Sequence, residues 1–137
     1  MSPAPPDTVR RPPAPPEVHP TAIVDKTAHL AHGVLVGPYS IIEAGVVVGE
    51  GTKIESHVRI GRLTRIGRDN RIGHGAVLGT EPQDVTYRDE PTVLEVGDRN
   101  IFREYVTIHR GTAHTGKTVV GCDCFIMAYA QIGRAHV

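Results

Sequence analysis

Two charged stretches of the chain carry side chains that could do chemistry, and the second of them holds two histidines. The first stretch, GTEPQDVTYRDEPTVLEVGDRN at 79–100, carries two prolines, and the second, TIHRGTAHTGKTVVG at 107–121, contains His109 and His114. A histidine titrates near neutral pH, so it can serve as a general base or as a metal ligand. One histidine on a solvated loop is more often structural than catalytic. Catalysis at these residues therefore requires a fold that brings the two stretches to one face.

A zinc site of the γ-class carbonic anhydrase kind would need three histidines. The segment IGHGAVLG at 72–79 is similar to the G-H-x-x-x-L-H-G pattern of that class, but Gly79 stands where the second histidine belongs. A single ligand makes no metal site, so we interpret His74 as a surface residue at a corner. We expect no metal and no organic cofactor, and a carbonic anhydrase-like metalloenzyme is the alternative from another mechanistic class.

The element that must position the two loops is a repeat of six residues. Every sixth residue from Val18 to Leu78 is Val, Ile or Leu, and the same frame resumes at Val96 and again at Val120. Small residues follow these positions, and small or β-branched residues precede them by two. Neither the helical period of 3.6 nor the strand period of 2 produces this pattern.

Six residues are enough for one short strand and one tight corner. The aliphatic side chain then points inward, and glycine stands at the corner where a Cβ would crowd. Stacked coils bury a column of aliphatic side chains without large rings, which agrees with a chain that has two Phe and no Trp. The sequence predicts an all-β fold, a parallel β-solenoid of hexapeptide repeats.

Composition narrows the functional class. Fifteen basic and fifteen acidic residues balance, which argues against a nucleic-acid partner, and no apolar run is long enough for a membrane span. Cys122 and Cys124 are too close for an easy mutual disulfide, which suits a reducing compartment and a cytoplasmic protein. We expect residues 1–17, rich in proline, to form a disordered tail, and residues 18–130 to form the solenoid, with loops at about 80–95 and 110–118.

Several segments together resemble one enzyme family. They are HPTAIV at 19–24, IGRDNRIG at 66–73, PQDVTY at 82–87, VGDRNIFREYVTIHRGT at 96–112 and FIMAYA at 125–130. The family is that of the hexapeptide-repeat acyl-carrier-protein–UDP-N-acetylglucosamine O-acyltransferases. The resemblance implies a left-handed parallel β-helix, here truncated to the N-terminal half, and a homotrimer at full length. It also implies transfer of a 3-hydroxyacyl group from acyl carrier protein to the 3-hydroxyl of UDP-N-acetylglucosamine, the first step of lipid A synthesis. Another hexapeptide-repeat acyl- or acetyltransferase is the nearer alternative.

The same resemblance implies the roles of individual residues. Gln83, Asp84 and His109 would bind substrate, together with Gln131, which stands at the first histidine of the family's A-H-I-A-H-D segment. The second histidine of that segment is the family's general base, and Arg134 occupies its position. Arginine cannot act as a base near neutral pH, so the chain as written lacks its catalyst. His136 is two residues beyond Arg134, but the hexad frame, which holds at Ile132, argues against a shifted base.

The last residues have a simple explanation outside the fold. IGRAHV is the translation of ATC GGA AGA GCA CAC GTC, which matches a common sequencing adapter, and the adapter's leading AG after a C would encode Gln131. We therefore expect 131–137 to be a non-native read-through tail. The chain would then be a fragment without transferase activity of its own.

Overall fold

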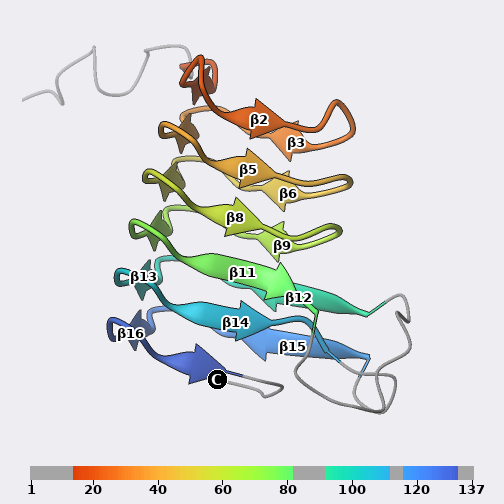
Figure 1. Ribbon diagram of the computed structural model, residues 1–137, viewed down its shortest axis with the longest axis vertical. Coiled ribbons are helices and arrows are strands. Elements are labelled where there is room, and N and C mark those ends of the chain that lie inside the picture. The colour runs from red at the N-terminus through yellow and green to blue at the C-terminus, as the bar shows by residue number, and fades with distance from the viewer. Residues whose placement is uncertain (1–13, 82–91, 112–115, 133–137) are drawn as a thin grey trace, which may run out of the picture.

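The computed structural model describes residues 14–81, 92–111 and 116–132, and these form a stack of parallel β-coils (Figure 1). The coils build three sheets, which we call A, B and C. Sheet A contains β1 (Glu17–Val18), β4 (Leu35–Val36), β7 (Lys53–Ile54), β10 (Arg71–Ile72), β13 (Ile101–Phe102) and β16 (Phe125–Ile126). Sheet B contains β2 (Ile23–Val24), β5 (Ile41–Ile42), β8 (Arg59–Ile60), β11 (Val77–Thr80), β14 (Thr107–His109) and β17 (Gln131–Ile132). Sheet C contains β3 (His29–Leu30), β6 (Val47–Val48), β9 (Arg65–Ile66), β12 (Val93–Val96) and β15 (Lys117–Val120).

One coil consists of three hexads, so each strand pairs with the strand three further along the chain. Leu35 lies opposite Lys53, eighteen residues later, and Ile41 lies opposite Arg59 in the same way. The two loop stretches lengthen the step without breaking the stack, since Arg71 pairs with Ile101 across the first of them. The period of six predicted from the sequence is thus one side of a three-sided coil.

The second residue of each two-residue strand points inward. From Val36 to Ile126 the described hexad column is buried, and the single ring in it is Phe102, which is 1% exposed. Val18 departs from the expectation because it is 41% exposed, lying in the first described coil with a neighbouring coil on one side only. The stack also starts slightly earlier than expected, because the carbonyl of Ala14 accepts a hydrogen bond from the Gly33 N–H at 2.8 Å.

Small buried residues tie successive coils together. The Ser40 hydroxyl donates to the Glu55 carbonyl at 2.7 Å, and the Thr52 hydroxyl donates to the Gly67 carbonyl at 2.8 Å. Both side chains are fully buried, so these bonds satisfy polar groups that would otherwise be costly inside the stack. The small residues that precede each aliphatic by two therefore act as the sequence predicts, packing beneath the neighbouring corner.

At the corners, the close approach between coils and the left-handed backbone conformation, both expected to require glycine, occur at two different positions. Gly49 follows a strand directly, and a Cβ there would lie 2.6 Å from the Gly67 carbonyl carbon, so crowding excludes a side chain. The left-handed backbone falls two residues further on, where Tyr39, His57 and Tyr105 have φ of 59°, 56° and 58°. Glycine is thus required by close approach of the coils, whereas ordinary side chains tolerate the turn itself.

Two remaining expectations concern the chain as a whole. Among the described residues there is no helix with the length and apolarity to cross a membrane. Cys122 and Cys124 are free thiols.

Candidate active site

The corner between sheets B and C in the last three coils collects the loop ends. Strand β11 ends at Thr80 before the first loop, and β14 ends at His109 before the second. Strand β17 follows on the next coil, and β17, β14 and β11 are neighbours in sheet B. Figure 1 shows β11 and β14 one above the other in the stack, and Thr80 lies opposite His109. The solenoid therefore brings together the strand ends from which the two charged stretches begin.

A β-bulge at Gly79 directs Thr80 into this corner. The register between β11 and β14 shifts between Leu78 and Thr80, so that Thr80 lies opposite His109. Gly79 has a φ of +78°, and a Cβ there would collide with the Thr64 side chain. Bulges commonly re-aim side chains beside active sites. Sequence reasoning missed Thr80, although Gly79 at the end of the last regular hexad marks the place.

His109 is held between two polar side chains. It is 5% exposed, its Nδ1 lies 3.5 Å from Thr80 Oγ1, and its Nε2 lies 3.4 Å from Gln131 Nε2. Both contacts lie at the long end of hydrogen-bond distance. They place the His109 ring between polar side chains on the coils either side of it.

Arg110 and Gly111 begin the second loop and attach it to the first. The Arg110 N–H donates to the Thr80 carbonyl at 2.8 Å, and its Nη1 donates to the Gly79 carbonyl at 3.2 Å. Gly111 runs so close to the Lys117 backbone that a Cβ would collide with it. These contacts hold the start of the second loop against the end of β11 and against Lys117.

The other residues singled out from the sequence fall outside the described part of the chain. Gln83 and Asp84 lie within 82–91, while Arg134 and His136 lie within 133–137. Of the expected site residues, the structure brings together His109 and Gln131. It also continues the sheet B register through that coil, with Thr107 opposite Gln131 and Ile108 opposite Ile132.

Metal chemistry finds no support among the residues that the structure describes. They contain no group of three or more His, Cys, Asp or Glu side chains arranged to hold a metal ion. His74 lies at another corner, between sheets A and B, and is half-buried where we expected a surface residue. Its ring nitrogens face Ser56 Oγ at 2.8 Å and Tyr105 Oη at 3.0 Å, within a column of stacked corner rings.

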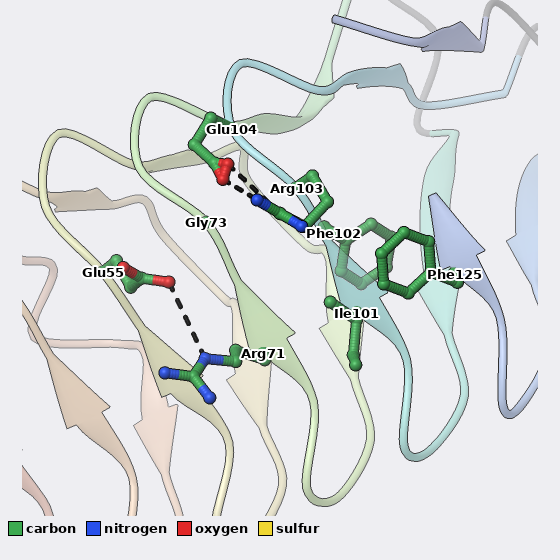
Figure 2. A pocket seen from close by; sticks show the side chains of 8 residues that line it. All are labelled: Glu55, Arg71, Gly73, Ile101, Phe102, Arg103, Glu104 and Phe125. Atoms are coloured by element: carbon green, nitrogen blue, oxygen red, sulfur yellow. Dashed lines mark hydrogen bonds and ion pairs between the residues drawn. The ribbon is translucent and has the colours of Figure 1, made fainter. Parts of the chain in front are cut away.

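A well-formed hollow on the outer face of sheet A lies away from the histidine corner. It encloses about 330 Å³ and is lined by apolar and charged side chains (Figure 2). Arg71 faces Glu55 at 3.9 Å, and Arg103 faces Glu104 at 2.9 Å. The hydrogen bond from Arg103 lowers the pKa of Glu104, so this carboxylate stays ionised and paired. No histidine lines this hollow, so the B–C corner, where His109 lies, is the candidate active site.

Sequence comparison places the chain among known transferases. The family described as bacterial transferase hexapeptide (six repeats) matches residues 27–62. The acyl-[acyl-carrier-protein]–UDP-N-acetylglucosamine O-acyltransferase of Cupriavidus taiwanensis is 64% identical over 119 residues, which are 86% of this chain and 45% of that protein. The enzyme of the same name from Chlorobaculum tepidum is 56% identical over 117 residues. The chain thus spans a little under half the length of the curated relatives it matches.

Solved structures agree with the sequence relatives. The UDP-N-acetylglucosamine O-acyltransferase of Moraxella catarrhalis superposes with a TM-score of 0.84 at 43% identity, covering 85% of this chain and 46% of that one. The corresponding protein from Acinetobacter baumannii gives 0.83 at 42% identity, with the same coverage of both chains. The shared fold is the left-handed parallel β-helix, which confirms the handedness expected from the resemblance.

Proposed function

We propose that this chain, which belongs to the hexapeptide-repeat UDP-N-acetylglucosamine O-acyltransferases, serves the reaction of that family. The reaction transfers a 3-hydroxyacyl group from acyl carrier protein to the 3-hydroxyl of UDP-N-acetylglucosamine and begins lipid A synthesis. One observation carries the proposal. The chain is 64% identical to the Cupriavidus taiwanensis enzyme over 86% of its own length.

The chemistry needs a base and an oxyanion site. The sugar hydroxyl attacks the thioester carbonyl, its proton passes to a base, and the carrier thiolate leaves once the tetrahedral intermediate collapses. Removing that proton in the transition state typically contributes about 10²–10⁴-fold. Backbone N–H groups at rigid corners suit the developing oxyanion, because they need no reorganisation. This route uses no metal and no organic cofactor.

His109 fits a substrate-binding role better than that of the base. Its Nε2 faces Gln131 and its Nδ1 faces Thr80, so both nitrogens are engaged within the protein. The general base belongs at position 134, where arginine stands. We assign Gln83 and Asp84 of the first loop, together with His109 and Gln131, to substrate binding. The 137-residue chain itself should not catalyse acyl transfer.

Assembly and compartment follow from the same proposal. We infer a cytoplasmic homotrimer at full length, with the active site between neighbouring subunits. Neighbouring outward-facing apolar side chains on sheet B support a covered face: Ile23 is 65% exposed, and Ile41, which lies opposite it, is 39% exposed. Such side chains in a contiguous patch commonly mark interfaces. Analytical ultracentrifugation of the full-length source protein at trimer mass supports this assembly, whereas a monomer contradicts it.

A chimera tests the proposed reaction directly. Residues 14–130 of this chain would be joined to the C-terminal half of the Cupriavidus taiwanensis relative, which restores that enzyme's own residues from position 131 onward. We expect transfer of a 3-hydroxyacyl group from carrier protein to UDP-N-acetylglucosamine, measured by mass spectrometry of the sugar nucleotide. A folded chimera without transfer would overturn the proposed function.

Matched variants separate catalysis from folding. A chimera that keeps Gln131 and Arg134 should fold equally and lose at least a hundredfold in turnover, because it lacks the base. Asp84→Ala should lower turnover without changing the melting temperature, since Asp84 falls in the stretch of sequence that interrupts the hexad frame. Glu50→Ala serves as the control, because Glu50 lies at the C–A corner and forms an exposed ion pair with Arg68.

A further inference from the structure

The B–C corner departs from a hydrogen-bond pattern that ties the earlier coils together. In those coils, the polar side chain two residues before an inward aliphatic donates to a corner carbonyl of the next coil. The Thr52 hydroxyl donates to the Gly67 carbonyl, fifteen residues later, and Ser40 makes the same contact over the same interval. At the B–C corner, that interval would pair the Thr64 hydroxyl with the Gly79 carbonyl.

Thr64 does not form this bond. Its Oγ1 is buried and has no hydrogen-bond partner among the residues that the structure describes. The Gly79 carbonyl accepts instead from Arg110 Nη1 at 3.2 Å, and the next carbonyl, that of Thr80, accepts from the Arg110 backbone N–H at 2.8 Å. A buried hydroxyl without a partner is unfavourable, and proteins keep such groups chiefly at functional or strained sites. The diverted carbonyl therefore calls for a functional reason.

The diverted carbonyl belongs to the β-bulge in β11. Leu78 pairs with Ile108 in regular register. A regular strand would continue by placing Gly79, which has no side chain, opposite His109. The bulge inserts Gly79 with a φ of +78°, so that Thr80 lies opposite His109 instead. As a result, the Thr80 hydroxyl lies 3.5 Å from His109 Nδ1.

We propose that Thr80 is a positioning residue, which holds the His109 ring in the orientation that substrate binding requires. The inference rests on the proposed function, in which His109 binds substrate. The ring is 5% exposed, so the side chains around it set its rotation. With Thr80 on the Nδ1 edge, the Nε2 edge is directed at position 131 of the next coil, where Gln131 Nε2 lies 3.4 Å away. A group that is oriented before substrate arrives loses less conformational freedom on binding.

Three isosteric changes from threonine to valine separate positioning from stability. Thr80→Val removes the positioning hydroxyl, Thr64→Val removes a buried hydroxyl without a partner, and Thr52→Val removes one that donates to a carbonyl. We expect the urea midpoint of the 137-residue chain to stay unchanged in Thr80→Val, to rise in Thr64→Val and to fall in Thr52→Val. Equal falls in Thr64→Val and Thr52→Val would overturn the argument that the bulge leaves Thr64 unsatisfied.

NMR of the same chain measures the state of the His109 ring. Imidazole ¹⁵N resonances report the hydrogen bonding of each ring nitrogen, and the His109 signals are those that His109→Gln removes. We expect Thr80→Val to shift the Nδ1 resonance, whereas Thr80→Ser, which keeps a hydroxyl, and Thr64→Val should leave it in place. Thr80→Ala repeats the test if the valine variant does not fold. An Nδ1 resonance that is unchanged in the variants without the hydroxyl overturns the proposal.

Kinetics of the active chimera connect the orientation of His109 with substrate. Thr80→Val should raise the KM for UDP-N-acetylglucosamine about three- to tenfold, as for loss of one neutral hydrogen bond, while kcat changes less. Thr80→Ser should keep KM within about twofold of the parent chimera, because its hydroxyl replaces the lost one. Parallel losses of kcat and melting temperature in Thr80→Val would show a merely structural role and overturn the proposal. An inactive chimera with the expected NMR response would refute acyl transfer alone, whereas an active chimera with the same KM in Thr80→Val would refute positioning alone.

Discussion

Ile41 and Ile42 are consecutive residues of β5 and offer a matched test of the stack. Ile42 is 1% exposed and Ile41 is 39% exposed, because successive side chains of a strand point to opposite faces. Ile42→Ala leaves a cavity inside a rigid column and should cost about 2–5 kcal/mol. Ile41→Ala removes the same atoms from the outer face, where no closed cavity forms, and should cost about 1 kcal/mol.

Urea denaturation followed by far-UV circular dichroism measures this difference. The free energy of unfolding of a domain this size is about 5–15 kcal/mol, so Ile42→Ala should shift the midpoint visibly. Solenoid coils contact only their neighbours, so a few coils can unfold separately from the rest. The comparison therefore uses variants whose free energy of unfolding has the same dependence on urea concentration, because a changed dependence reveals such partial unfolding. Equal losses from the two substitutions, or a larger loss from Ile41→Ala, would refute the inward assignment of the hexad column.

Three further outcomes are expected. Gly79→Ala should destabilise the chain by about 1–3 kcal/mol, because its left-handed backbone and the adjacent Thr64 side chain exclude a Cβ; an unchanged urea midpoint would contradict this. The Arg99 hydrogen bond lowers the pKa of Asp123 below 3.8, so the stability it adds is present above 3.8 and disappears as pH falls through the folded pKa. Asp123→Asn should flatten acid denaturation in that range, measured by circular dichroism. Sequencing the source locus should give histidine codons where Gln131 and Arg134 now stand, and genomic coding for the present residues would disprove the read-through tail.

The fold was predictable from the sequence because every hexad of the solenoid forms the same local structure, a short strand followed by a corner. Aliphatic residues at a spacing of six, with a glycine next to them, specify a short strand and a close approach to the adjacent coil. Val36, Ile60 and Ile72 are buried as the frame predicts. Val18 occupies a hexad position but is exposed, because burial requires a neighbouring coil on both sides. The period of six alone does not show whether both coils are present.

The candidate site was predictable only in part. The motif around His109 directed attention to the second loop, and the resemblance implied a role for Gln131. No spacing rule connects Thr80 with His109, which are far apart in the chain and meet through a bulge. A hollow lined in part by Glu43, Arg62 and Arg110 could not be predicted either, because these residues converge only when successive coils are stacked.

The sequence by itself determined the parallel solenoid, its inward column and the two loops that carry the functional motifs. These properties depend on local periodicity and on the volume available at a corner, both of which can be read along the chain. The tertiary structure decided which side chains meet at the B–C corner and how their charges are shared. Those contacts join residues separated by a coil or more, and they depend on register and on one bulge. Linear spacing does not encode such contacts, because a shift of one residue turns every outward side chain to the other face.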